Sequence, residues 1–181
     1  MSDDDEYLEK SSAAARMGTA AEYLVAASAI LATGGELNVS TSLVDDEGVD
    51  LVFHRRGSSA TLAVQVKARM STGTQVGQGK VMAFVRSQTF QPRPGLDMLF
   101  VAVDVERGAV MTAWLIPSAV FQEMVTEPNS QGRFRFSASM KPGSKDRWTP
   151  FRLEPDELPK RILTRLAELE RPSGPGGATS G

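Results

Sequence analysis

The sequence predicts an α/β domain in which helices flank a central mixed β-sheet. Three features indicate this class: an alanine-rich helix near the N-terminal end, a cluster of apolar strand patterns in the middle, and an amphipathic helix near the C-terminal end. The chain has 181 residues, of which 41% are hydrophobic, so it is long enough to form one domain with a substantial core.

A single domain is expected over residues 11–170. Residues 1–10 (MSDDDEYLEK) are acidic and residues 171–181 (RPSGPGGATSG) are rich in Pro, Gly and Ser, so both ends are predicted to be flexible. The chain has no cysteine, which excludes disulfides and thiolate zinc sites and favours a cytoplasmic location. The longest apolar segment carries Arg16 and Glu22, so it is not expected to span a membrane.

The first element is predicted to be a helix over residues 13–32. Ser11 or Ser12 can cap its start, and Gly34 and Gly35 end it. Five apolar residues recur at helical spacing and are predicted to face the core: Met17, Ala20, Leu24, Ala27 and Leu31.

Seven segments have the apolar patterns of strands. They are ELNVSTSL (36–43), VDLVFHR (49–55), TLAVQVKA (61–68), VMAFVR (81–86), DMLFVAVDV (97–105), VMTAWLI (110–116) and RFRFSAS (133–139). The pair 97–105 and 110–116 is predicted to form a hairpin. The polar segment 71–80 is predicted to be a loop, and helices are predicted within 117–125 and 154–169.

Residues 48–68 predict a hairpin with one polar face. Gly-Ser at 57–58 suits a two-residue turn, because glycine can adopt the positive φ that such a turn needs. In this register Asp50 lies opposite Gln65, with Cβ atoms about 5 Å apart. Lys67 lies on the same face, about 7 Å further along its strand. The register therefore gathers a carboxylate, an amide and an ammonium group.

The other face of this hairpin is uniformly apolar and is predicted to face the core. Its residues are Val49, Leu51 and Phe53 on one strand and Leu62, Val64 and Val66 on the other. A one-residue slip would bury the charged side chains instead, so the alternation determines the register even if the turn differs.

The polar group suits phosphodiester chemistry. A carboxylate and an amide oxygen are hard oxygen ligands of the kind that Mg²⁺ prefers. A bound divalent ion polarises a phosphate oxygen and lowers the pKa of a bound water. A nearby lysine can orient that water or offset negative charge on the phosphate.

Asp50, fourteen intervening residues, and then Gln-Val-Lys at 65–67 resemble the signature of the PD-(D/E)XK nuclease superfamily, which has the restriction-endonuclease-like fold. Glu22, within GTAAEYLVAASAIL, matches the helix glutamate that often completes the metal site of this family. The motifs cover roughly residues 16–70. Beyond them, only the order of the elements is compatible with the family.

The resemblance implies an endonuclease that hydrolyses DNA with Mg²⁺ or Mn²⁺. Asp50, Gln65 and Glu22 would be the catalytic metal ligands, and Lys67 would position the attacking water. The family most often has Glu or Asp two positions before the lysine. Some branches, including Mrr-type nucleases, carry Gln there and remain nucleases, but Gln supplies no charge, so metal binding would depend more on Asp50 and Glu22.

The alternative function is a catalytically inactive nuclease-fold module that binds nucleic acid or a protein. Individually, Asp50 can be a solvated residue at a strand start, Glu22 a solvated helix residue, and Lys67 an ordinary residue on an exposed sheet face. Asp46 can approach the same site from its loop. The sequence leaves open DNA against RNA, the cleavage specificity and the biological pathway.

The sequence also permits a basic surface. Residues 1–50 hold 11 acidic and 2 basic residues, whereas residues 51–181 hold 11 acidic and 18 basic residues. Five cations are predicted to contact nucleic acid: Arg55, Arg56, Arg69, Lys80 and Arg147. Trp148 can either stack on a base or anchor the last helix in the core. Cutting both strands usually needs two sites, which is compatible with a homodimer.

Overall fold

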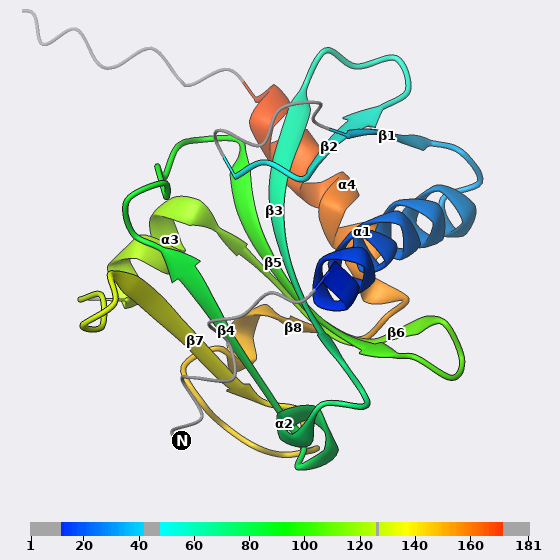
Figure 1. Ribbon diagram of the computed structural model, residues 1–181. Coiled ribbons are helices and arrows are strands. Elements are labelled where there is room, and N and C mark those ends of the chain that lie inside the picture. The colour runs from blue at the N-terminus through cyan, green and yellow to red at the C-terminus, as the bar shows by residue number, and fades with distance from the viewer. Residues whose placement is uncertain (1–11, 42–47, 126, 172–181) are drawn as a thin grey trace, which may run out of the picture.

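The computed structural model describes residues 12–41, 48–125 and 127–171 (Figure 1). The acidic N-terminal segment, the tail beyond Arg171 and Asp46 lie outside these residues, so the expectations for them stay predictions. Within the described part of the chain, no helix is long and apolar enough to cross a lipid bilayer.

The main sheet has six strands in the order β1-β2-β3-β5-β6-β8. These are β1 (Leu37–Thr41), β2 (Leu51–Arg55), β3 (Thr61–Met70), β5 (Leu96–Asp104), β6 (Ala109–Pro117) and β8 (Arg152–Leu153). The β3–β5 pair is parallel and the other pairs are antiparallel, so the sheet is mixed, as predicted. The predicted hairpin of β5 and β6 is confirmed.

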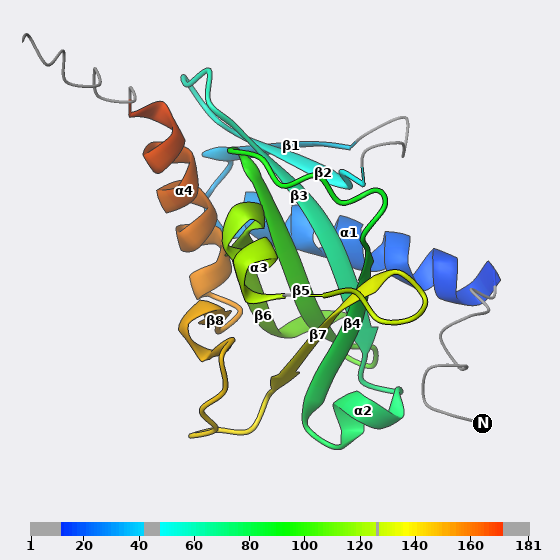
Figure 2. The ribbon, with the colours of Figure 1, turned by 90° about the vertical axis from the view of Figure 1, so that its left-hand side faces the viewer.

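Helices cover one face of this sheet, and a small second sheet with one helix covers the other (Figures 1 and 2). On the helix side lie α1 (Ser12–Ala32) and α4 (Glu157–Glu170). On the other side lie α3 (Ser118–Met124) and the antiparallel pair of β4 (Lys80–Arg86) and β7 (Arg133–Ser139). The predicted α/β architecture, a central mixed sheet flanked by helices, is confirmed.

Helix α1 packs on the sheet through small residues. Its buried residues are Ala21, Val25 and Ala29. The predicted core face is therefore wrong, because Met17 is 37% exposed and Leu31 is 81% exposed. Most of the helix is apolar, so hydrophobic periodicity does not distinguish its faces. The sheet instead contacts the face on which alanines allow a close approach.

The predicted register of the β2–β3 hairpin is confirmed, although the turn differs from the prediction. Leu51 lies opposite Val64, and the other β2–β3 pairs follow the same register. The amide of Ser58 donates to the carbonyl oxygen of Arg55 at 3.1 Å, and Gly57 has a φ of +78°. The tight turn is therefore one residue earlier than expected, and the loop is longer. Alternating burial preserves the register.

Strand β3 has one edge that β2 covers only in part. The ladder from β2 reaches residues 61–64 of β3, whereas β5 pairs with residues 63–70 on the other edge. The chain passes from β3 to β5 through α2 (Thr74–Gly77) and β4. The segment predicted as a loop at 71–80 thus contains one helical turn, which buries Val76.

An aromatic core lies between the main sheet and the β4–β7 pair. The rings of Phe100 and Phe136 stack with centroids 3.8 Å apart, and Phe121 stacks on Trp148. Trp148 is fully buried, which confirms its interpretation as a core residue and excludes stacking on a base in this conformation. This core holds β4 and β7 away from the main sheet as a separate layer.

Candidate active site

The candidate site begins with Asp50, immediately before β2. Its backbone amide donates to the carbonyl oxygen of Val64 at 3.0 Å. Its carboxylate oxygen Oδ2 accepts a hydrogen bond from the backbone amide of Val66 at 2.6 Å. The side chain thus takes the place of the next ladder bond, where β2 no longer covers the edge of β3. Asp50 is half-buried, and this bond orients its carboxylate along the edge.

Gln65 lies against Gly48, two residues before Asp50. A Cβ atom built on Gly48 would lie 2.6 Å from Nε2 and 3.3 Å from Cδ of Gln65. The amide of Gln65 therefore occupies the space that any other residue at position 48 would fill. Gly48 also has a φ of +68°, a conformation that favours glycine. The segment leading to Asp50 and the side chain of Gln65 are thus in direct contact.

Lys67 shares the face of Gln65. Strand residues alternate between faces, and Val64 and Val66 belong to the core on the helix side. Gln65 and Lys67 therefore project from the opposite face, the one that β4 and β7 cover further along. Both side chains are half-buried.

Arg69 continues this face but is held by the backbone. Its Nε donates to the carbonyl oxygen of Met82 on β4 at 2.7 Å, and its Nη1 donates to the carbonyl oxygen of Ala68 at 2.8 Å. These bonds tie β4 to β3. The guanidinium group thus has a structural role that its assignment as a nucleic-acid contact did not anticipate.

Glu22 approaches from the other side of the sheet. It follows the buried Ala21 on α1, which packs on the same core as Val64 and Val66. Helix α1, which carries Glu22, therefore lies on one side of β3, and Lys67 projects from the other side. Asp50 lies at the open edge of β3, between these two sides. Glu22 is half-buried.

The remaining predicted nucleic-acid contacts are scattered. Arg55 pairs through Nε with Oε1 of Glu36 at 2.9 Å, and Arg56 is exposed in the hairpin turn. Lys80 begins β4. Arg147 donates from Nη1 to the carbonyl oxygen of Met124 at 2.8 Å, and its guanidinium lies 4.8 Å from the centre of the Trp148 ring. These four cations do not form one surface.

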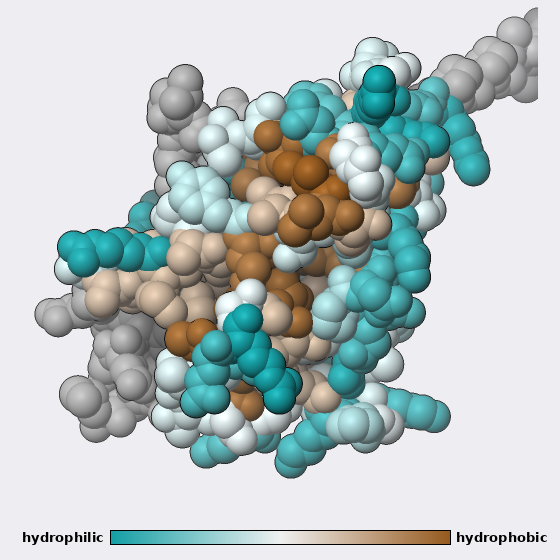
Figure 3. All heavy atoms as spheres, turned by 90° about the vertical axis from the view of Figure 1, so that its right-hand side faces the viewer, coloured by the Kyte–Doolittle hydropathy of each residue, from teal (hydrophilic) through white to brown (hydrophobic). Residues whose placement is uncertain are grey.

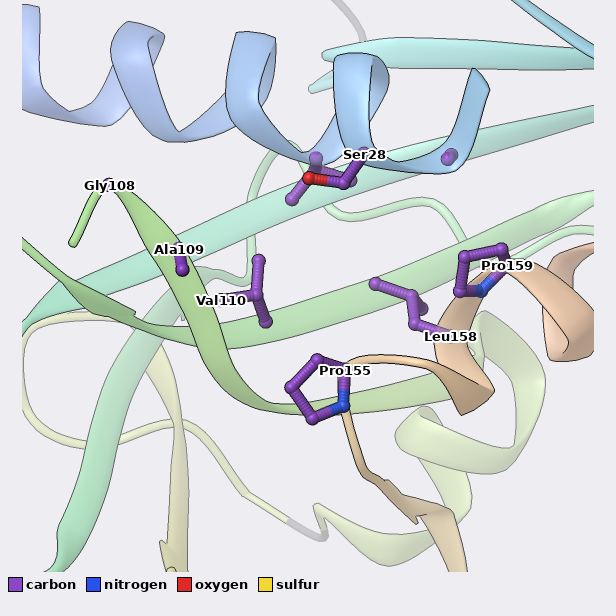
Figure 4. A pocket seen from close by; sticks show the side chains of 9 residues that line it. Ser28, Gly108, Ala109, Val110, Pro155, Leu158 and Pro159 are labelled. Carbon is purple, nitrogen blue, oxygen red and sulfur yellow. The ribbon is translucent and has the colours of Figure 1, made fainter. Parts of the chain in front are cut away.

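A separate pocket lies between α1, the β5–β6 turn and the start of α4 (Figure 4). Its volume is about 170 Å³. It is lined by Val25, Ser28, Ala29, Gly108, Ala109, Val110, Pro155, Leu158 and Pro159. Figure 3 shows hydrophobic side chains gathered in a hollowed band on the right-hand side of the molecule as drawn in Figure 1. None of the nine lining residues is titratable, so this pocket offers no acid, base or charged ligand.

Sequence reasoning missed the contribution of Gly48. The signal was present as a glycine two residues before the aspartate, but its contact with Gln65 depends on how the two segments meet. Among the described residues, no group of three His, Cys, Asp or Glu side chains could hold a metal ion. The candidate oxygen donors are instead the carboxylate of Asp50, which accepts from the amide of Val66, and the amide of Gln65, which lies against Gly48.

Neither a protein-family model nor a curated protein sequence matches the chain. Among solved structures, the chain is similar to a bacterial homing endonuclease. The two are 22% identical, the match covers 80% of this chain and 91% of that one, and the TM-score is 0.47.

Proposed function

We propose that the chain is a divalent-metal-dependent nuclease that hydrolyses phosphodiester bonds in DNA. The observation that carries the proposal is the contact of the Gly48–Asp50 segment with Gln65, beside Lys67 on the same face of β3. A buried structural hairpin has no need for these three polar side chains in its centre. Their order and spacing also resemble the PD-(D/E)XK signature.

The donor set fits a hard divalent cation. Asp50 and Gln65 offer a carboxylate and an amide oxygen, and Glu22 would add a second carboxylate from α1. These three residues would hold Mg²⁺ or Mn²⁺. The bound ion would polarise a phosphate oxygen and make a bound water more acidic.

Lys67 would act on the water and the phosphate. Its ammonium group has three N–H donors and no acceptor, so it can orient a water oxygen and balance negative charge on phosphate oxygens. The carboxylate of Asp50 would bind the ion in a fixed orientation, because its Oδ2 already accepts a hydrogen bond from the amide of Val66. Gly48 would keep the amide of Gln65 beside it.

The test is cleavage of supercoiled plasmid and of branched DNA by the purified chain with Mg²⁺ or Mn²⁺. We expect cutting by the wild type and a loss of at least about 100-fold in Lys67→Ala, the usual effect of removing one charge-stabilising group. Asp50→Asn should lose cutting as well. Arg107→Ala, in the exposed β5–β6 turn, is the matched control. Inactivity of the wild type would contradict the proposal. So would cutting at the wild-type rate by both Lys67→Ala and Asp50→Asn.

A second candidate function is metal-free binding of nucleic acid. It is favoured by the neutral amide at position 65 and by the backbone bond that already engages Asp50. This module would bind DNA in EDTA and never cut it.

The nuclease proposal also includes DNA as the partner, a homodimer for double-strand cutting and a cytoplasmic location. Sedimentation with and without DNA measures the oligomeric state.

A further inference from the structure

The β4–β7 pair has one apolar face and one basic face. Its inner residues pack in the aromatic core: Val81, Ala83, Val85, Phe134, Phe136 and Ala138. Neighbouring residues in a strand point to opposite faces, so the alternate residues face away from this core. Figure 2 shows β4 and β7 on one side of the main sheet and α1 on its far side.

Cross-strand register places four cations on the outer face. Arg86 lies opposite Arg133, Phe84 opposite Arg135, and Lys80 opposite Ser139. Directly opposed residues share a face, with Cβ atoms about 5 Å apart. The basic ribbon is defined here as Lys80, Arg86, Arg133 and Arg135. The other residues on this side of the two strands are Met82, which is buried, and Phe84, Ser137 and Ser139; none of them is acidic.

No carboxylate compensates these cations within the described part of the chain. None of the four takes part in an ion pair there, whereas Arg55, Arg107, Arg152, Lys160, Arg161 and Arg165 each do. Opposed like charges destabilise a strand pair, so the Arg86–Arg133 pair does not serve the ribbon itself. Two opposed arginines next to a third suit a ligand that carries a row of negative charges.

The basic face continues at the start of β4. Gly79 has a φ of +77°, and a Cβ atom built on it would lie 3.2 Å from Cγ and 3.3 Å from Cε of Lys141. The stem of Lys141 therefore lies across Gly79, beside Lys80. The amide of Met140 donates to the carbonyl oxygen of Gly79 at 2.8 Å, which fixes this approach. Lys141 is exposed and adds a fifth cation.

We propose that the basic ribbon binds the phosphate backbone of duplex DNA. The six steps from Lys80 to Arg86 span about 20 Å at about 3.3 Å per residue. This length corresponds to about six base pairs of a duplex, which carries about one negative charge per 1.7 Å of its axis. The inference deepens the proposed function by naming the surface that holds the substrate, and it rests on that function for the choice of DNA as the polyanion.

The ribbon is connected to the candidate site through β4. Arg69 bonds the carbonyl oxygen of Met82, in the middle of β4, from the same face of β3 that carries Gln65 and Lys67. DNA held on the ribbon is therefore anchored to the strand that bears the candidate catalytic lysine. Phosphate contacts of this kind position a nucleic acid but do not read its sequence.

The test measures binding of the full chain to a fluorescein-labelled 30-base-pair duplex in EDTA, by anisotropy over a range of salt concentrations. We expect Arg86→Glu and Arg133→Glu each to weaken binding about tenfold and to reduce the salt slope by about one. The matched control is Arg107→Glu, which reverses the same charge at a side chain that is 84% exposed in the β5–β6 turn. It should bind like the wild type.

Thermal unfolding separates lost binding from lost folding. Arg133→Glu places a carboxylate opposite Arg86, so its melting temperature should equal or exceed that of the wild type while its binding falls. The inference is overturned if both ribbon variants bind as tightly as the wild type, or if Arg107→Glu loses as much affinity. It is also overturned if the chain binds vesicles of phosphatidylcholine and phosphatidylserine but not the duplex.

Binding in EDTA does not depend on cleavage, so the two proposals can fail separately. If ribbon variants lose binding and no condition yields cutting, the basic ribbon is supported and the nuclease proposal fails. If the wild type cuts DNA and the ribbon variants bind and cut equally well, the nuclease proposal is supported and the ribbon inference fails.

Discussion

The two faces of the main sheet carry charge in different ways. On the helix side, Arg165 of α4 bonds both carboxylate oxygens of Asp97 at 2.8 and 2.9 Å, and it also contacts Glu168. Arg161 pairs with Glu168 as well. The Asp97 side chain is fully buried, and Arg165 is 12% exposed. On the other side, the basic ribbon has no carboxylate partner among the described residues.

This difference separates charges that hold the fold from charges available to a ligand. The hydrogen bonds that Arg165 donates to Asp97 raise the pKa of Arg165, and the hydrogen bond that Arg165 donates to Glu168 lowers the pKa of Glu168. Arg165 thus favours the ionised form of Glu168, and its hydrogen bonds to Asp97 attach α4 to β5. The α4 cluster is defined here as Asp97, Arg161, Arg165 and Glu168. We therefore expect substitutions in this cluster to change stability. Substitutions in the basic ribbon and the candidate site should change binding and cleavage instead.

The largest expected effect is in the α4 cluster. Arg165→Met should lower the free energy of unfolding by about 3–5 kcal/mol, because it removes the partner of the fully buried Asp97 side chain. Urea unfolding measures the loss. Lys160→Met, which breaks a pair with both side chains about three-quarters exposed, is the control and should change stability by less than about 1 kcal/mol. Equal losses in both variants would show that the buried pair contributes no more to stability than an exposed one.

Gly48→Ala tests whether the contact of Gly48 with Gln65 serves the candidate site as well as the fold. It should cost about 1–3 kcal/mol from the left-handed backbone and displace the amide of Gln65, which its Cβ would meet at 2.6 Å. Gly57→Ala is the matched control, since Gly57 has a φ of +78° and no atom within 4 Å of a Cβ atom. Unfolding and cleavage are measured on both. If Gly57→Ala lost as much cleavage as Gly48→Ala, the loss could not be attributed to displacement of the Gln65 amide.

Gln65→Glu should strengthen metal binding. A second full charge beside Asp50 should lower the Mg²⁺ concentration for half-maximal cutting by about tenfold, since ligand charge tunes the affinity for hard cations. A titration of cleavage against Mg²⁺ measures the shift, and isothermal calorimetry with Mn²⁺ provides a readout without DNA. An unchanged midpoint in both measurements would place the metal away from position 65.

Arg133→Glu should give a smaller stability change of opposite sign to that of Arg165→Met. Replacing an opposed like-charge pair by an opposite-charge pair should raise the free energy of unfolding by about 0.2–1 kcal/mol. Arg135→Glu, opposite Phe84, is the control and should show a smaller gain. Urea unfolding at low salt measures both. Destabilisation by Arg133→Glu would mean that the ribbon depends on its arginines for folding.

The pH dependence of the α4 cluster should give the smallest effect, because Glu168 is 36% exposed. Its pKa is lowered from 4.5 in the folded state, so its contribution to stability is present above pH 4.5 and is lost as the pH falls through the folded pKa. The stability difference between the wild type and Glu168→Gln should therefore shrink below pH 4.5. Urea unfolding at pH 7 and at pH 3 measures it. A stability difference between the two proteins that is larger at pH 3 than at pH 7 would contradict this prediction.

Much of the fold could be predicted from local patterns. The alternation of apolar and polar residues in 49–55 and 61–68 determined the register of β2 and β3, because a slip by one residue would exchange the two faces. The same register places Gln65 against Gly48, two residues before Asp50. The prediction of the Gly57-Ser58 turn was wrong without consequence, because the buried faces set the pairing.

Other features had no local signal. The alanine-rich helix α1 has nearly uniform hydrophobicity, so the choice of Ala21 and Val25 over Met17 depends on contact with the sheet. The structural bonds of Arg69 to β4 depend on how that strand crosses β3. The contact of Gly48 with Gln65 likewise joins segments that are distant in sequence. The catalytic roles of Asp50, Gln65, Lys67 and Glu22 stay predictions.

The sequence by itself determined where the longer helices and strands form and which face of each strand is polar, since those properties repeat along a short stretch of chain. The tertiary structure alone decided that β4 and β7 leave the main sheet, and hence that four cations share one outer face. Strand patterns specify the inner and outer sides of a strand but not its neighbour. Packing of the aromatic core around Phe136 selects that neighbour, because the large rings fill the space between the two sheets.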